Sequence, residues 1–170
     1  MKNIIVCDID GTIANLRHRL HYIQNEDGSK KRYKDTDWDS FHAACVDDEP
    51  YEDVIEILLS LVEGHGDREV YFFSGRNESV RRETVQWMEE HVLCHSSIKQ
   101  RTYGPHWLNM RSEGDRRPDT LIKLEMMQDF RFTPDTVLCI LDDRQSVVDM
   151  WRENGFRVLQ VDAWEDATRT

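Results

Sequence analysis

The segment that decides the fold lies at the start of the chain, Ile4-Ile5-Val6-Cys7-Asp8-Ile9-Asp10-Gly11-Thr12. Its first four residues are apolar, and two aspartates follow them. A short apolar run of this kind is typical of a strand in a parallel sheet that is covered on both faces. Because residues two apart on a strand point the same way, Asp8 and Asp10 are expected to converge. Gly11 allows a sharp turn at the strand end, where open α/β sheets bind ligands.

Two carboxylates at the end of a buried strand repel each other unless a cation or a shared proton lies between them. The pair Asp8 and Asp10 therefore predicts a Mg²⁺ site. Taken alone, the stretch is also compatible with a plain strand followed by an Asp-Gly turn.

A second apolar run, 69–73, ends in Ser74-Gly75-Arg76. These three residues offer a hydroxyl, a flexible backbone N–H and a guanidinium, which are groups that bind phosphate. A helix is expected to follow, so that the positive end of its dipole would lie near the hydroxyl.

Two further segments complete the pattern. Lys123 lies in a helical stretch that opens with 117–120, and the apolar run 137–141 ends in Asp142-Asp143. Each of these residues alone could be a turn residue, a solvated charge or a helix cap. Several strand ends that carry phosphate or metal chemistry together favour a phosphoryl-transfer site.

The combination of Asp8 to Thr12, Ser74, Lys123 and Asp142-Asp143 resembles the four motifs of the haloacid dehalogenase (HAD) phosphatase superfamily. The resemblance implies a three-layer α/β fold of Rossmann-like type with a central parallel sheet. It also implies that the first strand lies centrally, with the second and fourth strands beside it, and that a cap is inserted after the first strand.

A narrower resemblance links 111–123, 142–152 and 158–161 to the phosphatase domain of phage-type polynucleotide kinase/3′-phosphatase. It implies that Arg19 and Arg76 are phosphate-site arginines, and that Asp119 is a functional acid that orients Lys123 or Arg76. The chain has no Gly-x-x-x-x-Gly-Lys-Ser/Thr loop, so no ATP-binding kinase module is expected.

The alternation of apolar runs and helical segments predicts one α/β domain over 1–170, with a parallel sheet and right-handed crossovers. The expected elements are strand 3–8, helix 51–63, strand 68–73, helix 77–91, strand 107–110, helix 118–129, strand 137–141, helix 144–154 and strand 156–161.

The segment 13–50 is too long for an ordinary connection in a compact domain, so we expect a small cap or flap there. Within it, Trp38, Phe41 and Cys45 have the spacing of one helix face. A packing arm that never meets substrate is the alternative interpretation.

Composition indicates a protein of the cytoplasm. None of the 170 residues belongs to an apolar run of about 20, the length that a membrane span needs. The start of the chain leads directly into the first strand, which leaves no room for a signal peptide. The four cysteines show no Cys-x-x-Cys spacing, as expected in a reducing compartment.

The net charge of −11 opposes nonspecific binding to long nucleic acid. Arginines nevertheless flank the expected site, and Arg111, Arg116 and Arg117 precede the Lys123 helix. A basic rim on an acidic protein suits a phosphorylated nucleic-acid end or a nucleotide.

The resemblance implies displacement through an aspartyl-phosphate. Asp8 would attack phosphorus, and Asp10 would protonate the leaving hydroxyl and then activate water. Mg²⁺ would be held by Asp8, Asp142 and the backbone carbonyl of Asp10, with Asp143 acting through water. The phosphoryl oxygens would be held by Ser74, Gly75, Arg76 and Lys123.

The predicted substrate is therefore a 3′-phosphate on a polynucleotide end or a nucleotide. A 5′(3′)-nucleotidase that acts on mononucleotides shares every catalytic residue and stays open at this point. A receiver-like phosphoacceptor module or an inactive binding protein fits less well, because neither needs Asp10.

Overall fold

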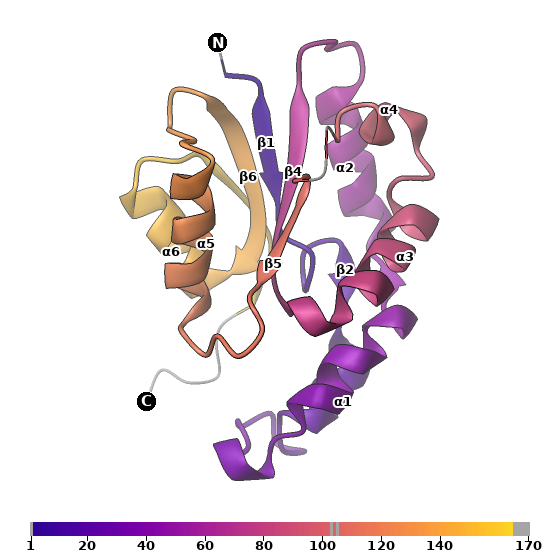
Figure 1. Ribbon diagram of the computed structural model, residues 1–170, viewed down its shortest axis with the longest axis vertical. Coiled ribbons are helices and arrows are strands. Elements are labelled where there is room, and N and C mark those ends of the chain that lie inside the picture. The colour runs from indigo at the N-terminus through magenta and orange to yellow at the C-terminus, as the bar shows by residue number, and fades with distance from the viewer. Residues whose placement is uncertain (1, 103, 105, 165–170) are drawn as a thin grey trace.

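The computed structural model describes residues 2–102, 104 and 106–164. A five-stranded parallel sheet forms its centre, in the spatial order β5–β4–β1–β6–β7 (Figure 1). The strands are β1 (Ile4–Cys7), β4 (Glu69–Asn77), β5 (Leu108–Arg111), β6 (Val137–Arg144) and β7 (Val158–Trp164). The predicted α/β class and the central position of β1 between β4 and β6 are confirmed.

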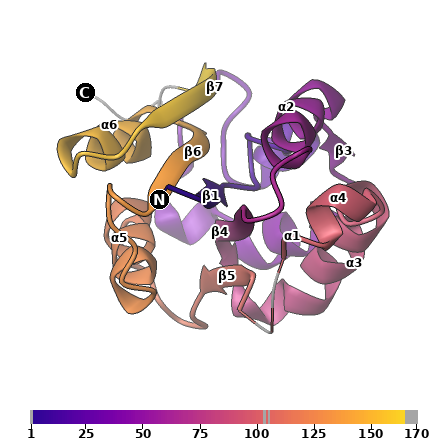
Figure 2. The ribbon, with the colours of Figure 1, turned by 90° about the horizontal axis from the view of Figure 1, so that it is seen from above.

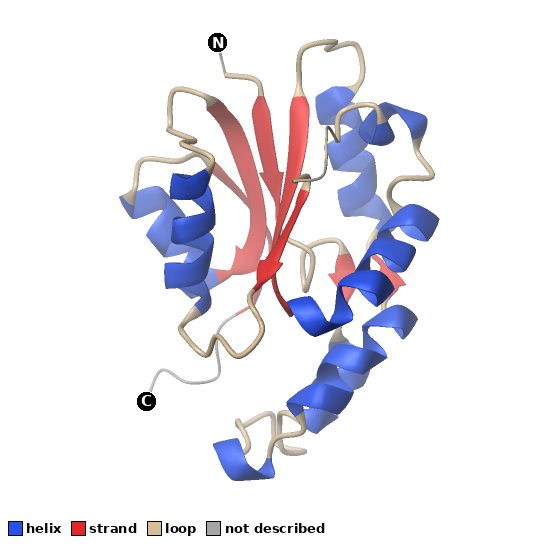
Figure 3. Cartoon of the chain, viewed as in Figure 1, coloured by secondary structure: helices blue, strands red, loops and turns tan. Residues whose placement is uncertain are grey.

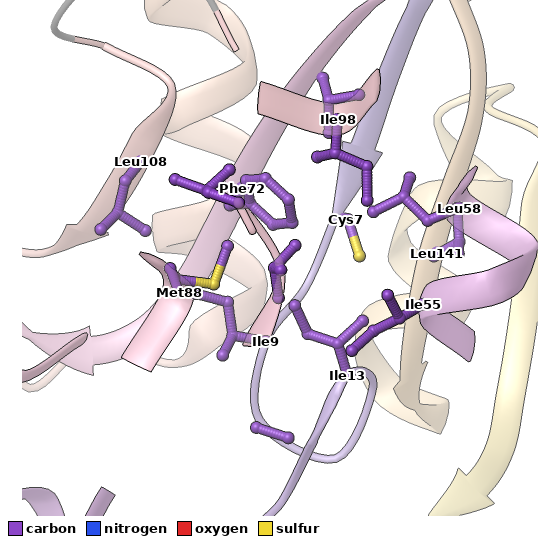
Figure 4. Close-up of a cluster of buried hydrophobic side chains, with 14 of the residues drawn as sticks. Cys7, Ile9, Ile13, Ile55, Leu58, Phe72, Met88, Ile98, Leu108 and Leu141 are labelled. Carbon is purple, nitrogen blue, oxygen red and sulfur yellow. The ribbon is translucent and has the colours of Figure 1, made fainter. Parts of the chain in front are cut away.

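Helices cover both faces of the sheet and produce three layers (Figures 2 and 3). One face carries α2 (Glu52–Val62), α3 (Arg81–His91) and α4 (Ser96–Lys99), and the other carries α5 (Asp119–Asp129) and α6 (Gln145–Glu153). The alternation of β1 explains the two cores: Ile5 and Cys7 join the first, and Ile4 and Val6 join the second. Figure 4 shows the first core around Cys7.

Strands β4 and β6 run further than predicted. The prediction ended them at 73 and 141, but Ser74 to Arg76 lie within β4, and Asp142 and Asp143 lie within β6. β4 pairs with β5 again at Asn77 and Arg111, after an irregularity that follows Ser74, and β6 still pairs with β7 at Asp142 and Arg144. A short 3-10 helix, η4 (Glu78–Val80), follows β4, so α3 begins at Arg81.

The segment 13–50 is tied at its two ends. β2 (Ala14–Asn15) and β3 (Glu49–Pro50) pair in an antiparallel manner and form a separate two-stranded sheet. Between them lie η1 (Arg17–Tyr22), η2 (Tyr33–Asp35), α1 (Trp38–Ala43) and η3 (Ala44–Asp47). We call residues 16–48 the insertion. Figure 1 shows α1 beyond the carboxyl ends of the central strands.

Helix α1 of the insertion is the predicted helix, and one of its apolar side chains, Trp38, is partly exposed. Asp37 caps α1 by accepting a hydrogen bond from the backbone N–H of Ser40. Trp38 packs edge-on against Phe41, as the spacing predicts, but Trp38 is 42% exposed whereas Phe41 and Cys45 are buried. Among the described residues, no helix is both long and apolar enough to cross a membrane.

Candidate active site

Three buried carboxylates form a cluster at the carboxyl edge of the sheet. Asp8 follows β1, and Asp142 and Asp143 belong to β6, which pairs directly with β1. One oxygen from each of the three lies within 4.8 Å of the others. Because β1 and β6 are neighbours in register, the fold itself brings these side chains together.

Lys123 of α5 completes this group, which we call the Asp8 cluster. Its Nζ donates hydrogen bonds to Asp8 Oδ1 at 2.7 Å and to Asp142 Oδ2 at 2.9 Å. All four side chains are buried. The predicted approach of Lys123 to the strand ends is thus present in the structure.

The Asp8 cluster contains three carboxylates and one cation, Lys123. Burial raises the pKa of Asp8 well above its usual value, even though Lys123 opposes the shift. Burial and the neighbouring Asp142 raise the pKa of Asp143 to about 7. Three carboxylates beside one ammonium leave two negative charges uncompensated, and hard carboxylate oxygens are the ligands that Mg²⁺ prefers. The residues therefore fit a divalent cation.

Neighbouring residues hold the cluster in place. The Thr12 hydroxyl lies 3.2 Å from Asp8 Oδ2 and 3.3 Å from Asp143 Oδ1. The indole N–H of Trp151 donates to Asp142 Oδ2 at 3.2 Å. Gly11 has a φ of +88° and packs so closely on Asp143 that a Cβ there would collide with the carboxylate.

Asp10 belongs to a second group. Its Oδ1 accepts hydrogen bonds from Arg19 Nη2 at 2.5 Å and from Arg76 Nε at 2.9 Å. The same guanidinium groups bind Asp48, with Arg19 Nε at 2.7 Å and Arg76 Nη2 at 2.6 Å. We call these four residues the Asp10 network. The structure thus places Arg19 and Arg76 on two carboxylates, whereas the resemblance implied that they contact phosphate.

The Asp10 network is balanced, with two carboxylates and two guanidinium groups. Arg19, Arg76 and Asp48 are buried, and Asp10 is partly buried. Burial alone would raise the pKa of Asp10, but Arg76 and Arg19 outweigh it and hold this pKa below its usual value. Asp10 therefore stays ionised at neutral pH, and its side chain is outside the Asp8 cluster.

Sequence reasoning missed Asp48. It lies 38 residues beyond Asp10, at the end of the insertion, and its backbone carbonyl accepts a hydrogen bond from Trp87 Nε1 at 2.7 Å. The available signal was an acidic pair, Asp47-Asp48, two residues after the buried Cys45.

Ser74 and Gly75 lie in β4 next to the Asp10 network. Ser74 is buried, and its Oγ accepts a hydrogen bond from the backbone N–H of Arg76 at 3.1 Å. A Cβ at Gly75 would lie 3.0 Å from Asp119 Oδ1, so a glycine lets Asp119 approach the strand.

The resemblance implied that Asp119 orients Lys123 or Arg76, and this role stays a prediction. Among the described residues, its carboxylate pairs with Arg111 and Arg144. Burial would raise the pKa of Asp119, but Arg144 and the other nearby cations lower it.

Arg116 and Arg117 lie in the loop before α5, outside both buried groups. Arg117 is half exposed and pairs with Asp115 at 2.7 Å and Glu125 at 2.6 Å. Arg116 is exposed and lines a surface recess together with the start of α1.

Comparison with known proteins places this site in a family. The model of the "Polynucleotide kinase PNKP phosphatase domain" matches residues 2–165. A protein of Autographa californica nuclear polyhedrosis virus, named "Putative bifunctional polynucleotide kinase/RNA ligase", is 30% identical over 149 residues. That match covers 88% of this chain but only 18% of the viral protein.

Two solved structures share the fold. A chain of the Pnkp1/Rnl/Hen1 RNA repair complex is 26% identical with a TM-score of 0.67, and the match covers 95% of this chain and 42% of that one. A HAD family enzyme from Bacteroides thetaiotaomicron, in complex with magnesium and inorganic phosphate, is 15% identical with a TM-score of 0.56; the match covers 99% of this chain and 98% of that one. The second likeness concerns the fold alone. The chain belongs to the family of polynucleotide kinase PNKP phosphatase domains, within the HAD phosphatases.

Proposed function

We propose that this chain is a Mg²⁺-dependent phosphomonoesterase that removes 3′-phosphate from polynucleotide ends or nucleotides through an aspartyl-phosphate. The observation that carries the proposal is the position of Asp8, whose carboxylate accepts a hydrogen bond from Lys123 and lies beside the acids of β6. The names of the viral relative and of the RNA repair complex support a nucleic-acid substrate.

In this proposal Asp8 attacks phosphorus, and the bond to the leaving hydroxyl oxygen breaks. Lys123 and Ser74 would stabilise the charge that develops on the phosphoryl oxygens, because both lie at the same sheet edge. A carboxylate nucleophile gives an acyl phosphate, which water then hydrolyses and so regenerates Asp8.

Asp8, Asp142 and the backbone carbonyl of Asp10 would hold Mg²⁺, and Asp143 would act through water. When bound, the ion would neutralise the negative charge that the carboxylates and the substrate phosphate share. Asp142 is fixed for this role by Lys123 and Trp151.

Asp10 would transfer protons to and from the reacting oxygens. Because Arg19 and Arg76 keep its pKa low, Asp10 must exchange one arginine contact for the leaving oxygen before it can carry a proton. The Asp10 network would then position the carboxylate and tune its pKa. Since Arg19 and Asp48 come from the insertion, we propose that the insertion is a small cap or flap of a single phosphatase domain.

The test is phosphate release from three substrates: a 3′-phosphorylated oligonucleotide, a 3′-mononucleotide and a 5′-mononucleotide. Each is assayed with Mg²⁺ and with a chelator. We expect release that needs Mg²⁺ and is fastest from the 3′-phosphorylated oligonucleotide. Faster release from the mononucleotides would favour the nucleotidase alternative, and equal release with the chelator would contradict the proposed metal site.

A further inference from the structure

The exposed ring of Trp38 forms one wall of a recess at the edge of the insertion. Trp38 is 42% exposed, one of the few large apolar side chains on the described surface. With Thr36, Asp37, Asp39 and Arg116 it lines an open recess of about 300 Å³. The recess joins the start of α1 to the loop before α5, which are far apart in the sequence.

The ring of Trp38 is held in a fixed orientation. Asp37 caps α1, and Trp38 packs edge-on against Phe41 at 5.7 Å and stacks on His42 at 5.9 Å between ring centroids. A rigid aromatic ring with one open side is a surface on which a nucleobase can stack, whichever base it is.

Phe41 connects this surface to the candidate active site. The guanidinium of Arg19 lies 4.4 Å from the centroid of the Phe41 ring, and the same guanidinium donates to Asp10. Phe41 therefore lies between Trp38, which lines the recess, and Arg19 of the Asp10 network.

The charges of the recess favour a base over the sugar-phosphate backbone. Asp37 and Asp39 would repel a phosphate group, but their carboxylates accept hydrogen bonds from the amino groups of bases. Arg116 also lines the recess and supplies a cation beside which a neighbouring phosphate could lie.

We propose that Trp38 is a stacking platform for one of the two bases nearest the phosphorylated end of a polynucleotide. This inference rests on the proposed function and adds a specificity element to it. The base would leave the strand and stack on the indole, while its phosphate terminus reaches Asp8.

The test uses single-stranded oligonucleotides with a terminal phosphate and one abasic site at position 1, 2 or 5 from that phosphate. A 3′-phosphate and a 5′-phosphate series are made, and kcat/KM is measured on the series that is a substrate. Stacking on an aromatic side chain contributes about 1–3 kcal/mol per base, so we expect a loss of roughly 5- to 150-fold at position 1 or 2. The abasic site at position 5 should have no effect.

The matched variants are Trp38→Ala, Trp38→Phe and Ile57→Ala. Trp38→Ala should lower kcat/KM on the intact strand by the same factor as the abasic site at position 1 or 2. On the substrate that already lacks the stacked base, Trp38→Ala should leave kcat/KM unchanged. Trp38→Phe should retain most of the activity, because a ring remains. Ile57→Ala removes another exposed apolar side chain, on α2, and should change nothing.

Equal kcat/KM on all abasic substrates, or equal loss for Trp38→Ala on substrates with and without the base, would overturn the stacking platform. The proposed function would survive that result if the 3′-phosphate series is still dephosphorylated. Activity on the 5′-phosphate series alone would refute the 3′-phosphatase proposal, and the abasic positions would still test the platform.

Discussion

The Asp8 cluster and the Asp10 network lie side by side, yet their charges are arranged in opposite ways. In the first, three buried carboxylates share one ammonium. In the second, two carboxylates meet two guanidinium groups. Buried carboxylates that outnumber the cations beside them need a further cation. A group with equal numbers of carboxylates and cations needs none, but it loses stability when any one partner is removed. On this basis we propose that the Asp8 cluster holds the metal and attacks phosphorus, and that the arginines and Asp48 of the Asp10 network position Asp10 for proton transfer.

The largest expected effect comes from the two aspartates that the comparison separates. Asp8→Asn and Asp10→Asn should each lower kcat by at least about 10³-fold, because one removes the nucleophile and the other the proton carrier. Phosphate release under saturating substrate and Mg²⁺ measures both.

Stability should separate the same two variants. Without Mg²⁺, Asp8→Asn removes one uncompensated negative charge and should raise the free energy of unfolding by on the order of 1 kcal/mol. Asp10→Asn leaves two guanidinium groups short of a partner and should lower it by on the order of 2 kcal/mol. Urea unfolding in a chelator gives both values, and shifts of the same sign would refute the contrast in charge.

Asp48→Asn tests the network away from the reacting atoms. Asp48 is 3% exposed and binds both Arg19 and Arg76, so its loss leaves two buried guanidinium groups with the Asp10 carboxylate as their shared partner. We expect the free energy of unfolding to fall by about 3–5 kcal/mol, while the stabilisation that Mg²⁺ provides is kept. If Asp48→Asn instead lost the stabilisation by Mg²⁺ and kept its free energy of unfolding, Asp48 would not belong to the Asp10 network.

The two groups also differ in how well the sequence predicts them. Asp8 and Asp142 end apolar runs, and pairing of parallel strands then brings them to one edge, so local pattern and simple topology suffice. Lys123 could be included because its helix follows a recognisable motif.

The Asp10 network depends on contacts that no local pattern encodes. Asp48 meets Arg76 only because the insertion folds back through β2 and β3, and this path leaves no periodic signal. The partners of Asp119 were missed for the same reason. The spacing of Trp38 to Phe41 correctly predicts that their rings meet, but periodicity alone does not show that Trp38 stays partly uncovered at the start of α1.

The pH dependence of stability should reveal the Asp8 cluster. The pKa of Asp143 rises from its ordinary value of 3.8 to about 7 in the folded protein, so the folded state binds more protons between these values. In a chelator, the free energy of unfolding should therefore fall by on the order of a few kcal/mol as pH rises from about 4 to 7. Asp10 acts in the opposite direction, because its pKa is lowered, and its contribution is lost only as pH falls below about 4.

Mg²⁺ should reduce the fall in the free energy of unfolding between pH 4 and 7, since it supplies the positive charge that the Asp8 cluster lacks. Thermal unfolding between pH 4 and 8, with Mg²⁺ and with a chelator, makes the measurement. Asp142→Asn serves as the matched variant: it should need more Mg²⁺ for the same stabilisation. Identical melting curves with and without Mg²⁺ at pH 8 would contradict a metal site there.

The smallest effect is expected outside both groups, at Arg117. Arg117 and its partner Glu125 are about half exposed, so Arg117→Ala should change the free energy of unfolding very little. If Arg117 also meets a substrate phosphate, the salt dependence of kcat/KM on an oligonucleotide should fall by a slope of roughly 0.7. A change in kcat on a mononucleotide would instead place Arg117 at the reacting phosphate.

The division of roles between Asp8 and Asp10 is tested most directly by trapping the covalent intermediate. A 3′-³²P-labelled oligonucleotide is mixed with wild-type, Asp8→Asn and Asp10→Asn protein in Mg²⁺, quenched in acid, and the labelled peptide is identified. The account predicts label on Asp8 in the Asp10→Asn protein, where hydrolysis of the intermediate lacks its base, and no label in Asp8→Asn. Label on a residue other than Asp8, or label in the Asp8→Asn protein, would contradict it.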